Sequence, residues 1–303
     1  MPRMRKLIAG AVVLAALGAT GFWILSAPRP LPAEAIADVA DAAADRGERV
    51  FWAAGCASCH AGPQAEGEGR LELAGGLELA TPFGTFVAPN ISSHEEDGIG
   101  AWSVTEFANA MQRGISPDGR HYYPAFPYAS YARMTSGDVS DLYAFMKTLP
   151  AVEGTAPPHK VGFPFNVRRG LGLWKLLYLR DQPVVALTDD AGDALRRGKY
   201  LVEGPGHCGE CHTPRDVFGG TQYDRWLAGA PAPVGDGTIP NITPGGDVGE
   251  WSEIEIADYL ETGFTPDFDS AGGEMVSVIK NLANLPAEDR AAIAAYLKSV
   301  PAH

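Results

Sequence analysis

Cysteine is scarce in this sequence, with 4 in 303 residues. Alternating strand patterns are weak, and no Ser-His-Asp set, phosphate-binding loop or nucleotide fingerprint occurs. Basic residues are outnumbered, with 24 Lys+Arg against 37 Asp+Glu, and the formal net charge is −13. Nucleic acid is therefore excluded as a partner, because its phosphates require clustered positive charge.

The few cysteines all fall into two pentapeptides, Cys56-Ala-Ser-Cys59-His60 and Cys208-Gly-Glu-Cys211-His212. C-x-x-C-H is the spacing of c-type haem attachment. The two thiols can add to the two vinyl groups of one porphyrin, and the adjacent histidine then lies under the ring with a nitrogen toward the iron. A structural zinc site would explain the C-x-x-C pairs but not the histidine after each. The sequence therefore predicts two covalently bound haem c groups, held by Cys56, Cys59, Cys208 and Cys211, with His60 and His212 as iron ligands.

The two motifs belong to an internal repeat. "RGERVFWAAGCASCH" matches "RGKYLVEGPGHCGECH", "GAWSVTEFANAMQRGISPD" matches "GEWSEIEIADYLETGFTPD", and "LYAFMKTLP" matches "IAAYLKSVP", all at a nearly constant offset. We expect four segments: a signal-anchor helix and tether (1–32), a first haem domain (33–150), an interdomain strap (151–188) and a second haem domain (189–303).

Each copy predicts the same helices. One leads into the haem motif, over residues 38–54 or 190–202, and a second begins after Trp102 or Trp251 at a Ser-x-x-Glu capping box and ends at Gly114 or Gly263. A last helix follows Thr135 or Pro286, with apolar residues at core spacing. The predicted fold class is all-α, two tandem domains with long loops. The core residues predicted for the last helices are Leu142, Phe145, Met146, Ile293, Tyr296 and Leu297.

These segments resemble known proteins. Each half is similar to a class I cytochrome c domain, and the whole chain resembles the cytochrome c subunit of bacterial membrane-bound alcohol, aldehyde and gluconate dehydrogenases. "TPFGTFVAPNIS", "SPDGRHYYPAFPY", "FPFNVRRGLGLWKLLYL" and "HCGECHTPRD" carry the likeness, with "AGGEMVSVIKNLANLPAEDRAAIAAYLKSVP" near the end. Subunits of that family usually carry three haems, whereas this chain has two attachment motifs.

The N-terminus is typical of an exported protein. Arg3, Arg5 and Lys6 precede residues 7–25, an apolar stretch whose one polar side chain is Thr20. The stretch suits an uncleaved membrane anchor better than a signal peptide, because it is long and the small-residue site near Ser26 is poor. The positive flank places the rest of the chain on the periplasmic side of the bacterial inner membrane. The alternative is a soluble periplasmic protein released by signal cleavage.

The second iron ligand differs between the copies. Met275, in a Gly-Gly loop, is the predicted distal ligand of the second haem, as the "GGxM" loop of the resembled family also implies. In the first copy the matching position holds Phe126, which cannot bind iron, where related subunits often have methionine. Met134 is the first choice for the distal ligand of the first haem. The alternatives are His121, Met111, or an open or water-bound iron with Phe126 packed over it.

The predicted function is electron transfer. A catalytic dehydrogenase subunit would reduce the chain, which would pass electrons to a quinone, a cytochrome or a terminal oxidase. The acidic excess, strongest in residues 201–303, would steer a basic partner toward the second haem. The strap would pack across its own two domains, or else Trp174, Leu176, Leu177 and Leu179 would form a docking surface for a catalytic subunit or for the membrane face. The alternative function is a dihaem enzyme whose first haem is open to peroxide or a sulfur compound.

Overall fold

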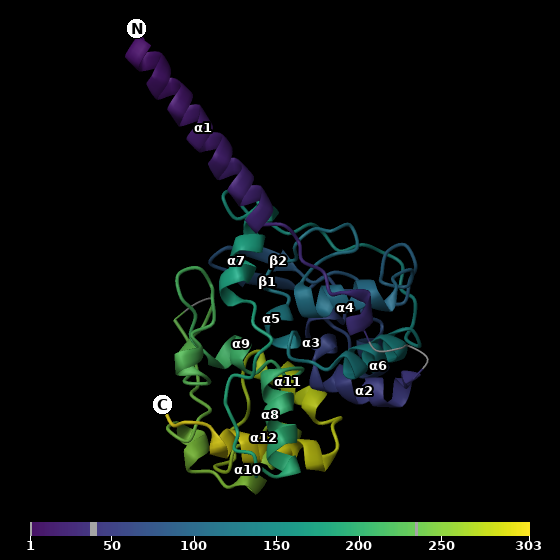
Figure 1. The fold of residues 1–303 in the computed structure, drawn as a ribbon. Coiled ribbons are helices and arrows are strands. Elements are labelled where there is room, and N and C mark those ends of the chain that lie inside the picture. The colour runs from purple at the N-terminus through teal and green to yellow at the C-terminus, as the bar shows by residue number, and fades with distance from the viewer. Residues whose placement is uncertain (1, 37–40, 234–235) are drawn as a thin grey trace.

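The computed structural model describes residues 2–36, 41–233 and 236–303. The chain is mostly helical, as predicted, and a long N-terminal helix projects from the body (Figure 1). The sequence prediction missed two short antiparallel hairpins, whose strands are too short to show alternation. In the first, β1 (Glu78–Thr81) pairs with β2 (Gly84–Val87); in the second, β3 (Ala230–Pro231) pairs with β4 (Thr238–Ile239).

The two copies of the repeat place their helices in the same order. The exact limits of the four predicted segments stay a prediction. The first copy contains α2 (Ala44–Ala53), α3 (Cys56–His60), α4 (Val104–Arg113), α5 (Tyr128–Tyr131) and α6 (Ser136–Met146). The second contains α8 (Asp193–Glu203), α9 (Gly209–His212), α10 (Glu253–Thr262), α11 (Met275–Leu282) and α12 (Ala287–Ser299). Single 3-10 turns lie at Ala33–Ala35, Gly67–Leu71, Arg168–Gly170, Tyr223–Arg225 and Asp247–Gly249.

The predicted helix ends are confirmed. Ser103 caps α4 and Ser252 caps α10, each with the reciprocal glutamate bond of a capping box. Gly114 and Gly263 end these helices at φ values of 57° and 80°, in the left-handed region that glycine adopts most easily. Thr135 caps α6 through its side chain.

Two predictions about helix starts are wrong. The helix expected over 38–54 is α2, which begins at Ala44 because the extended Ala43 donates its N–H to Asp141 Oδ1 at 2.7 Å; residues 38–40 lie outside the described part. The helix expected from 190 begins at Asp193, after the extended Gly192.

Met275 was expected in a loop, whereas it is the first residue of α11 and follows Gly272 and Gly273.

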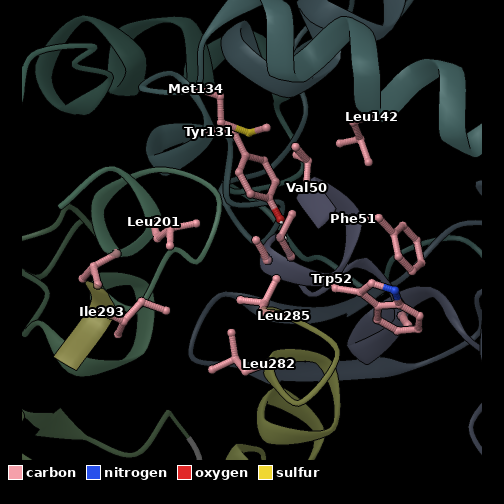
Figure 2. Packing of buried hydrophobic residues seen from close by; sticks show 14 of the residues in the cluster. Val50, Phe51, Trp52, Tyr131, Met134, Leu142, Leu201, Leu282, Leu285 and Ile293 are labelled. Atoms are coloured by element: carbon pink, nitrogen blue, oxygen red, sulfur yellow. Dashed lines mark hydrogen bonds between the residues drawn. The ribbon is translucent and has the colours of Figure 1, made fainter. Parts of the chain in front are cut away.

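Each copy is built around a close crossing of two helices. A Cβ atom on Gly47 would lie 2.0 Å from the Asp141 carbonyl oxygen where α2 crosses α6, and one on Gly198 would lie 1.8 Å from the Ala292 carbonyl oxygen where α8 crosses α12. Apolar side chains of both copies join in one cluster, seen in Figure 2. The residues predicted for the core of α6 and α12 are all buried in it.

The strap contains helix α7 (Leu171–Tyr178) and contacts both copies. Lys175 Nζ donates to the Arg113 and Gly114 carbonyl oxygens at 2.6 and 2.7 Å. On the other side, the Trp174 indole donates to the Phe218 carbonyl oxygen and the Tyr178 hydroxyl to Asp216. The strap therefore packs across both halves, as the first of the two sequence alternatives expected, although Leu176 and Leu177 stay exposed.

Helix α1 (Pro2–Leu25) carries exposed apolar side chains. Its segment Arg3–Leu25 is, within the described residues, the one helix long and apolar enough to cross a membrane, a test that a signal sequence also passes. The chain therefore has an N-terminal apolar helix of signal or anchor type.

Candidate haem-binding site

The backbone presents both thiols of each motif on one side. Gly55, with φ of 62°, ends the turn after α2, and the chain then re-enters a helix at Cys56. His207, with φ of 39°, makes the corresponding turn before Cys208. Residues three apart on a helix share a face, so each cysteine pair can reach one porphyrin. None of the four cysteines forms a disulfide.

The two motif histidines are held identically. His60 Nδ1 lies 2.8 Å from the Pro89 carbonyl oxygen, and His212 Nδ1 lies 2.9 Å from the Pro240 carbonyl oxygen. A carbonyl can only accept, so Nδ1 carries the proton and Nε2 keeps its lone pair for a metal. Burial lowers the pKa of both histidines and so favours the neutral, ligating form.

A second support holds the histidine backbone. The amide of Gly75 donates to the His60 carbonyl oxygen at 2.7 Å, and that of Gly229 donates to the His212 carbonyl oxygen at 2.8 Å. Both glycines have positive φ and pack against the loop that supplies the proline carbonyl. Sequence reasoning missed these supports, although "ELAGG" and "RWLAGA" recur in the repeat and indicate them.

The surroundings of the motifs suit a haem. Burial raises the pKa of the Cys56 and Cys208 thiols to about 12, which reports the apolar surroundings that a porphyrin needs. Trp226 packs directly against Gly209, inside the second motif. Its buried indole N–H lies close to the Tyr296 hydroxyl, without a hydrogen bond of good geometry among the described residues.

The candidate distal ligands lie in different environments. Met275 is half-buried at the start of α11, against the apolar cluster. Met134 is buried beside Tyr131, whose hydroxyl donates to the carbonyl oxygen of Ala54, close to the first motif (Figure 2). Met111 is buried in the same cluster, on α4.

Two other residues considered for the first iron lie elsewhere or cannot ligate. His121 is buried, with Nε2 2.9 Å from the Ser26 carbonyl oxygen and Nδ1 3.1 Å from Lys175 Nζ, so neither nitrogen is left for iron. Phe126 packs edge-on against Tyr131, at 5.8 Å between ring centroids. Tyr131 itself was not singled out by sequence reasoning.

The two motifs approach each other across the boundary between the copies. Ser130 donates to Glu210, inside the second motif, at 2.6 Å, and Asn281 donates to Ser58, inside the first motif, at 2.5 Å. These four residues are two pairs of repeat-equivalent positions, so the contacts cross as in a pseudo-twofold interface. Burial opposes the ionised form of Glu210, but Arg215 and Ser130 hold its pKa below the ordinary value.

The thiols of the two motifs are also close enough to interact. Burial, then the Glu274 carboxylate and the Cys211 thiol, raise the pKa of Cys59 to about 11. Burial and then the Glu210 carboxylate raise the pKa of Cys211, Arg215 opposes them, and Glu274 adds a smaller effect in the raising direction. The residue before Met275 therefore lies near both attachment motifs.

A second pair of crossed contacts joins the helices. Arg49, on α2, donates to Asp289 of α12 at 2.6 Å, and Tyr200, on α8, donates to Asp138 of α6. Arg197 adds a further bond to the fully buried Asp289. The interface thus places the haem motifs in a fixed mutual position.

Comparison with known proteins agrees with this geometry. Residues 44–150 match the family model for cytochrome c. A diheme cytochrome c-type protein of Cereibacter sphaeroides is 53% identical over 98% of this chain and 99% of its own length. The fructose dehydrogenase cytochrome subunit of Gluconobacter japonicus is 37% identical over 85% of this chain, and the gluconate 2-dehydrogenase cytochrome c subunit of Pantoea cypripedii 35% identical over 86%.

This chain spans 52% of the length of the fructose dehydrogenase subunit and 60% of that of the gluconate dehydrogenase subunit. The diheme relative, in contrast, is matched from end to end. The expected two haems and the expected family are confirmed by these likenesses. The chain belongs to the diheme cytochromes c, a family homologous to the cytochrome c subunits of dehydrogenases.

Proposed function

We propose that this chain relays single electrons from a catalytic dehydrogenase subunit to a quinone, another cytochrome or a terminal oxidase on the periplasmic side of the membrane. Its relatives include cytochrome subunits of dehydrogenases, which supports the donor. Each haem, when bound, supplies a one-electron iron couple. The polypeptide sets the spacing and the two potentials.

The observation that carries the proposal is the crossed contact between the motifs. Ser130 to Glu210 and Asn281 to Ser58 each tie an attachment motif of one copy to a helix of the other. An electron that enters at one motif thus has a second redox centre close by. An enzyme working at a single open iron would not require this fixed pairing.

We assign the attachment and the ligands residue by residue. Cys56 and Cys59 hold the first haem, and Cys208 and Cys211 hold the second. His60 and His212 are the proximal ligands, supported by their bonds to the two proline carbonyls. Met275 is the distal ligand of the second haem, supported by its place at the start of α11.

Met134 is the proposed distal ligand of the first haem. Its buried side chain lies beside Tyr131, whose hydroxyl donates to the carbonyl oxygen of Ala54, two residues before Cys56. His121 is disfavoured because both its nitrogens are bonded elsewhere. A thioether ligand favours reduced iron and so raises the potential.

We propose that α1 remains as a membrane anchor. Ser26, directly after α1, is fully buried, and its hydroxyl accepts from Arg169 at 2.9 Å. Arg169 also donates to the Trp23 carbonyl oxygen at 2.6 Å, at the end of α1. Cleavage of a signal near Ser26 would remove a residue that the strap holds in place. The anchor keeps the body at the periplasmic surface.

The test is isolation of the native chain from membranes with its partner. We expect detergent extraction to yield a complex with a large subunit that binds a flavin, pyrroloquinoline quinone or a molybdenum cofactor. Adding that subunit's substrate should reduce both haems in the complex and leave the isolated chain oxidised. Turnover of peroxide or a sulfur compound by the isolated chain, at an iron with an exchangeable position, would favour the enzyme alternative instead.

A further inference from the structure

Exposed apolar side chains gather near the base of α1. In the strap, Phe163 is 83% and Leu177 62% exposed, and in the loop after the second motif Val217 is 85% and Phe218 68% exposed. Phe165, Val167 and Leu176 are exposed in the same strap. Large apolar groups in water are unfavourable, and several together mark a contact surface.

The strap, this loop and the first hairpin form one surface. The Trp174 indole of α7 donates to the Phe218 carbonyl oxygen at 3.0 Å, which joins the strap to the loop. Phe83, in the turn between β1 and β2, packs edge-on against Phe165 at 5.1 Å between ring centroids. Segments far apart in sequence thus bring their apolar residues to the same side.

This surface is fixed to α1. A Cβ atom on Gly172 of α7 would lie 2.3 Å from the Ser26 carbonyl oxygen, so the strap helix lies against the end of α1. The Arg169 guanidinium lies 4.1 Å from the centre of the Trp23 ring. Figure 1 shows α7 and the first hairpin next to the base of α1, with α10 and α12 at the opposite end of the body.

The strap also has the charge that suits a phospholipid surface. Residues 154–180 contain no acidic residue, in a chain whose net charge is −13. Three arginines lie in this segment: Arg168 and Arg169 are half-buried and bond the His121 and Trp23 carbonyl oxygens, and Arg180 is exposed. Arginines next to partly inserted apolar side chains are typical of a protein face in the headgroup region.

We infer that the face formed by Phe163, Phe165, Leu177, Val217 and Phe218 lies in the headgroup region of the bilayer that α1 crosses. This inference rests on the proposed anchor. The bilayer is the occupant that the surroundings favour, because the apolar groups are continuous with the helix that would enter it. The face would hold the body close to the membrane, with α10 and α12 farthest from it.

The test uses the full chain, with both haems, in nanodiscs of zwitterionic and anionic phospholipid. The native cysteines are the proposed haem attachments, so a nitroxide label can be placed on a single new cysteine in Leu177→Cys, Phe218→Cys or, as matched control, Phe268→Cys. Phe268 is 88% exposed but lies in the loop after α10. An unchanged haem spectrum shows that each variant folds.

We expect collisions with a water-soluble nickel complex, measured by electron paramagnetic resonance, to be several-fold rarer at 177 and 218 than at 268. Equal collision rates at the three positions, with the chain retained in the nanodisc, would overturn the face alone. Release of the native chain from membranes by alkaline carbonate would overturn the anchor. Shielding that appears only after a dehydrogenase subunit is added would assign the face to a protein and contradict the inference.

Discussion

The two copies hold their motif histidines alike and differ at the positions proposed for the distal ligand. His60 and His212 each bond a proline carbonyl through Nδ1, and the carbonyl oxygen of each accepts from the amide of a glycine in a later loop. On the distal side one copy has Met275 at a helix start, while the other has Phe126 at the matching position and a buried Met134 farther on. The copies thus share the support of the motif histidine, whereas the methionine proposed as distal ligand comes from a different position in each copy.

The copies also differ in what covers them. In the first copy, Lys175 of helix α7 donates to the carbonyls that end α4, and Ile115, the next residue along the chain, is buried. Its counterpart in the second copy, Phe264, is 56% exposed. Equivalent positions therefore have different neighbours. This difference, with the different distal residues, leads us to expect two haems of unlike potential.

The largest effect is expected from removing one attachment site. In Cys208→Ala/Cys211→Ala the haem content per chain should fall to half, because no thioether bond then holds the second haem. Haem that survives denaturation, measured by alkaline pyridine absorbance, reports this directly. The matched control is Cys56→Ala/Cys59→Ala, which should leave only the Met275 haem. Full retention of covalent haem in either variant would refute the assignment of that motif.

The next effect concerns the distal ligand. Met275→His should lower the midpoint potential of one haem by an amount on the order of 0.2 V, because imidazole stabilises ferric iron more than a thioether does. The other midpoint should stay unchanged in the same optical redox titration. The conservative comparison is Met111→Leu, a buried methionine on α4 that should alter neither. An unaltered titration of Met275→His would remove this residue from the site.

The interface between the copies offers a smaller effect. Asp289→Ala should lower the free energy of unfolding by about 2 kcal/mol, because it removes a fully buried carboxylate that accepts from two arginines. The loss is limited because both arginines are partly exposed and stay hydrated. Denaturant unfolding measures this. Arg49→Ala, which removes the contacts of Arg49 with Asp289 and Glu288 but keeps the bond from Arg197, should cost less. Equal costs would show that Arg49 carries the whole contribution.

The same carboxylate predicts a pH dependence. Burial alone would raise the pKa of Asp289, but the bonds from Arg197 and Arg49 hold it below the ordinary value. The unfolded chain then binds more protons than the folded one between the two pKa values. The contribution is therefore present above the ordinary aspartate pKa and is lost as pH falls through the lower, folded one. In Asp289→Ala this part of the acid dependence should be missing.

The strap provides the smallest expected effect. Burial lowers the pKa of Lys175 to about 7, next to the ring nitrogen of His121. The unfolded lysine stays protonated well above that pH, so stability should rise by about 1 kcal/mol from pH 7 to pH 8. Thermal unfolding at the two pH values, compared with Lys175→Met, isolates this contribution. The same rise in the variant would assign the pH dependence to other groups.

Local patterns predicted much of this fold. The capping residues Ser103, Ser252 and Thr135 and the terminal Gly114 and Gly263 act through neighbours a few residues away, so the sequence shows them. The haem motifs are local in the same way. The start of α2 was misplaced because a distant carboxylate, Asp141, bonds the N–H of Ala43.

Contacts between the copies could not be predicted, because no local sequence pattern indicates them. Arg49 and Asp289 are 240 residues apart, and nothing near either residue indicates the other. The bond from Asn281 to Ser58 is hidden in the same way. The proline carbonyls that hold the histidines belong to the backbone, so their role depends on loop geometry. The packing of Tyr131 near the first motif likewise follows from the tertiary fold.

The most direct test of two unlike haems is an optical redox titration of the detergent-solubilised full chain, combined with the thioether-to-iron absorption band. We expect two midpoints, the higher one belonging to the Met275 haem, and a band that falls to half in Met134→Leu. One midpoint shared by both haems, with a band worth two haems that survives Met134→Leu, would contradict both the Met134 assignment and the difference between the two copies.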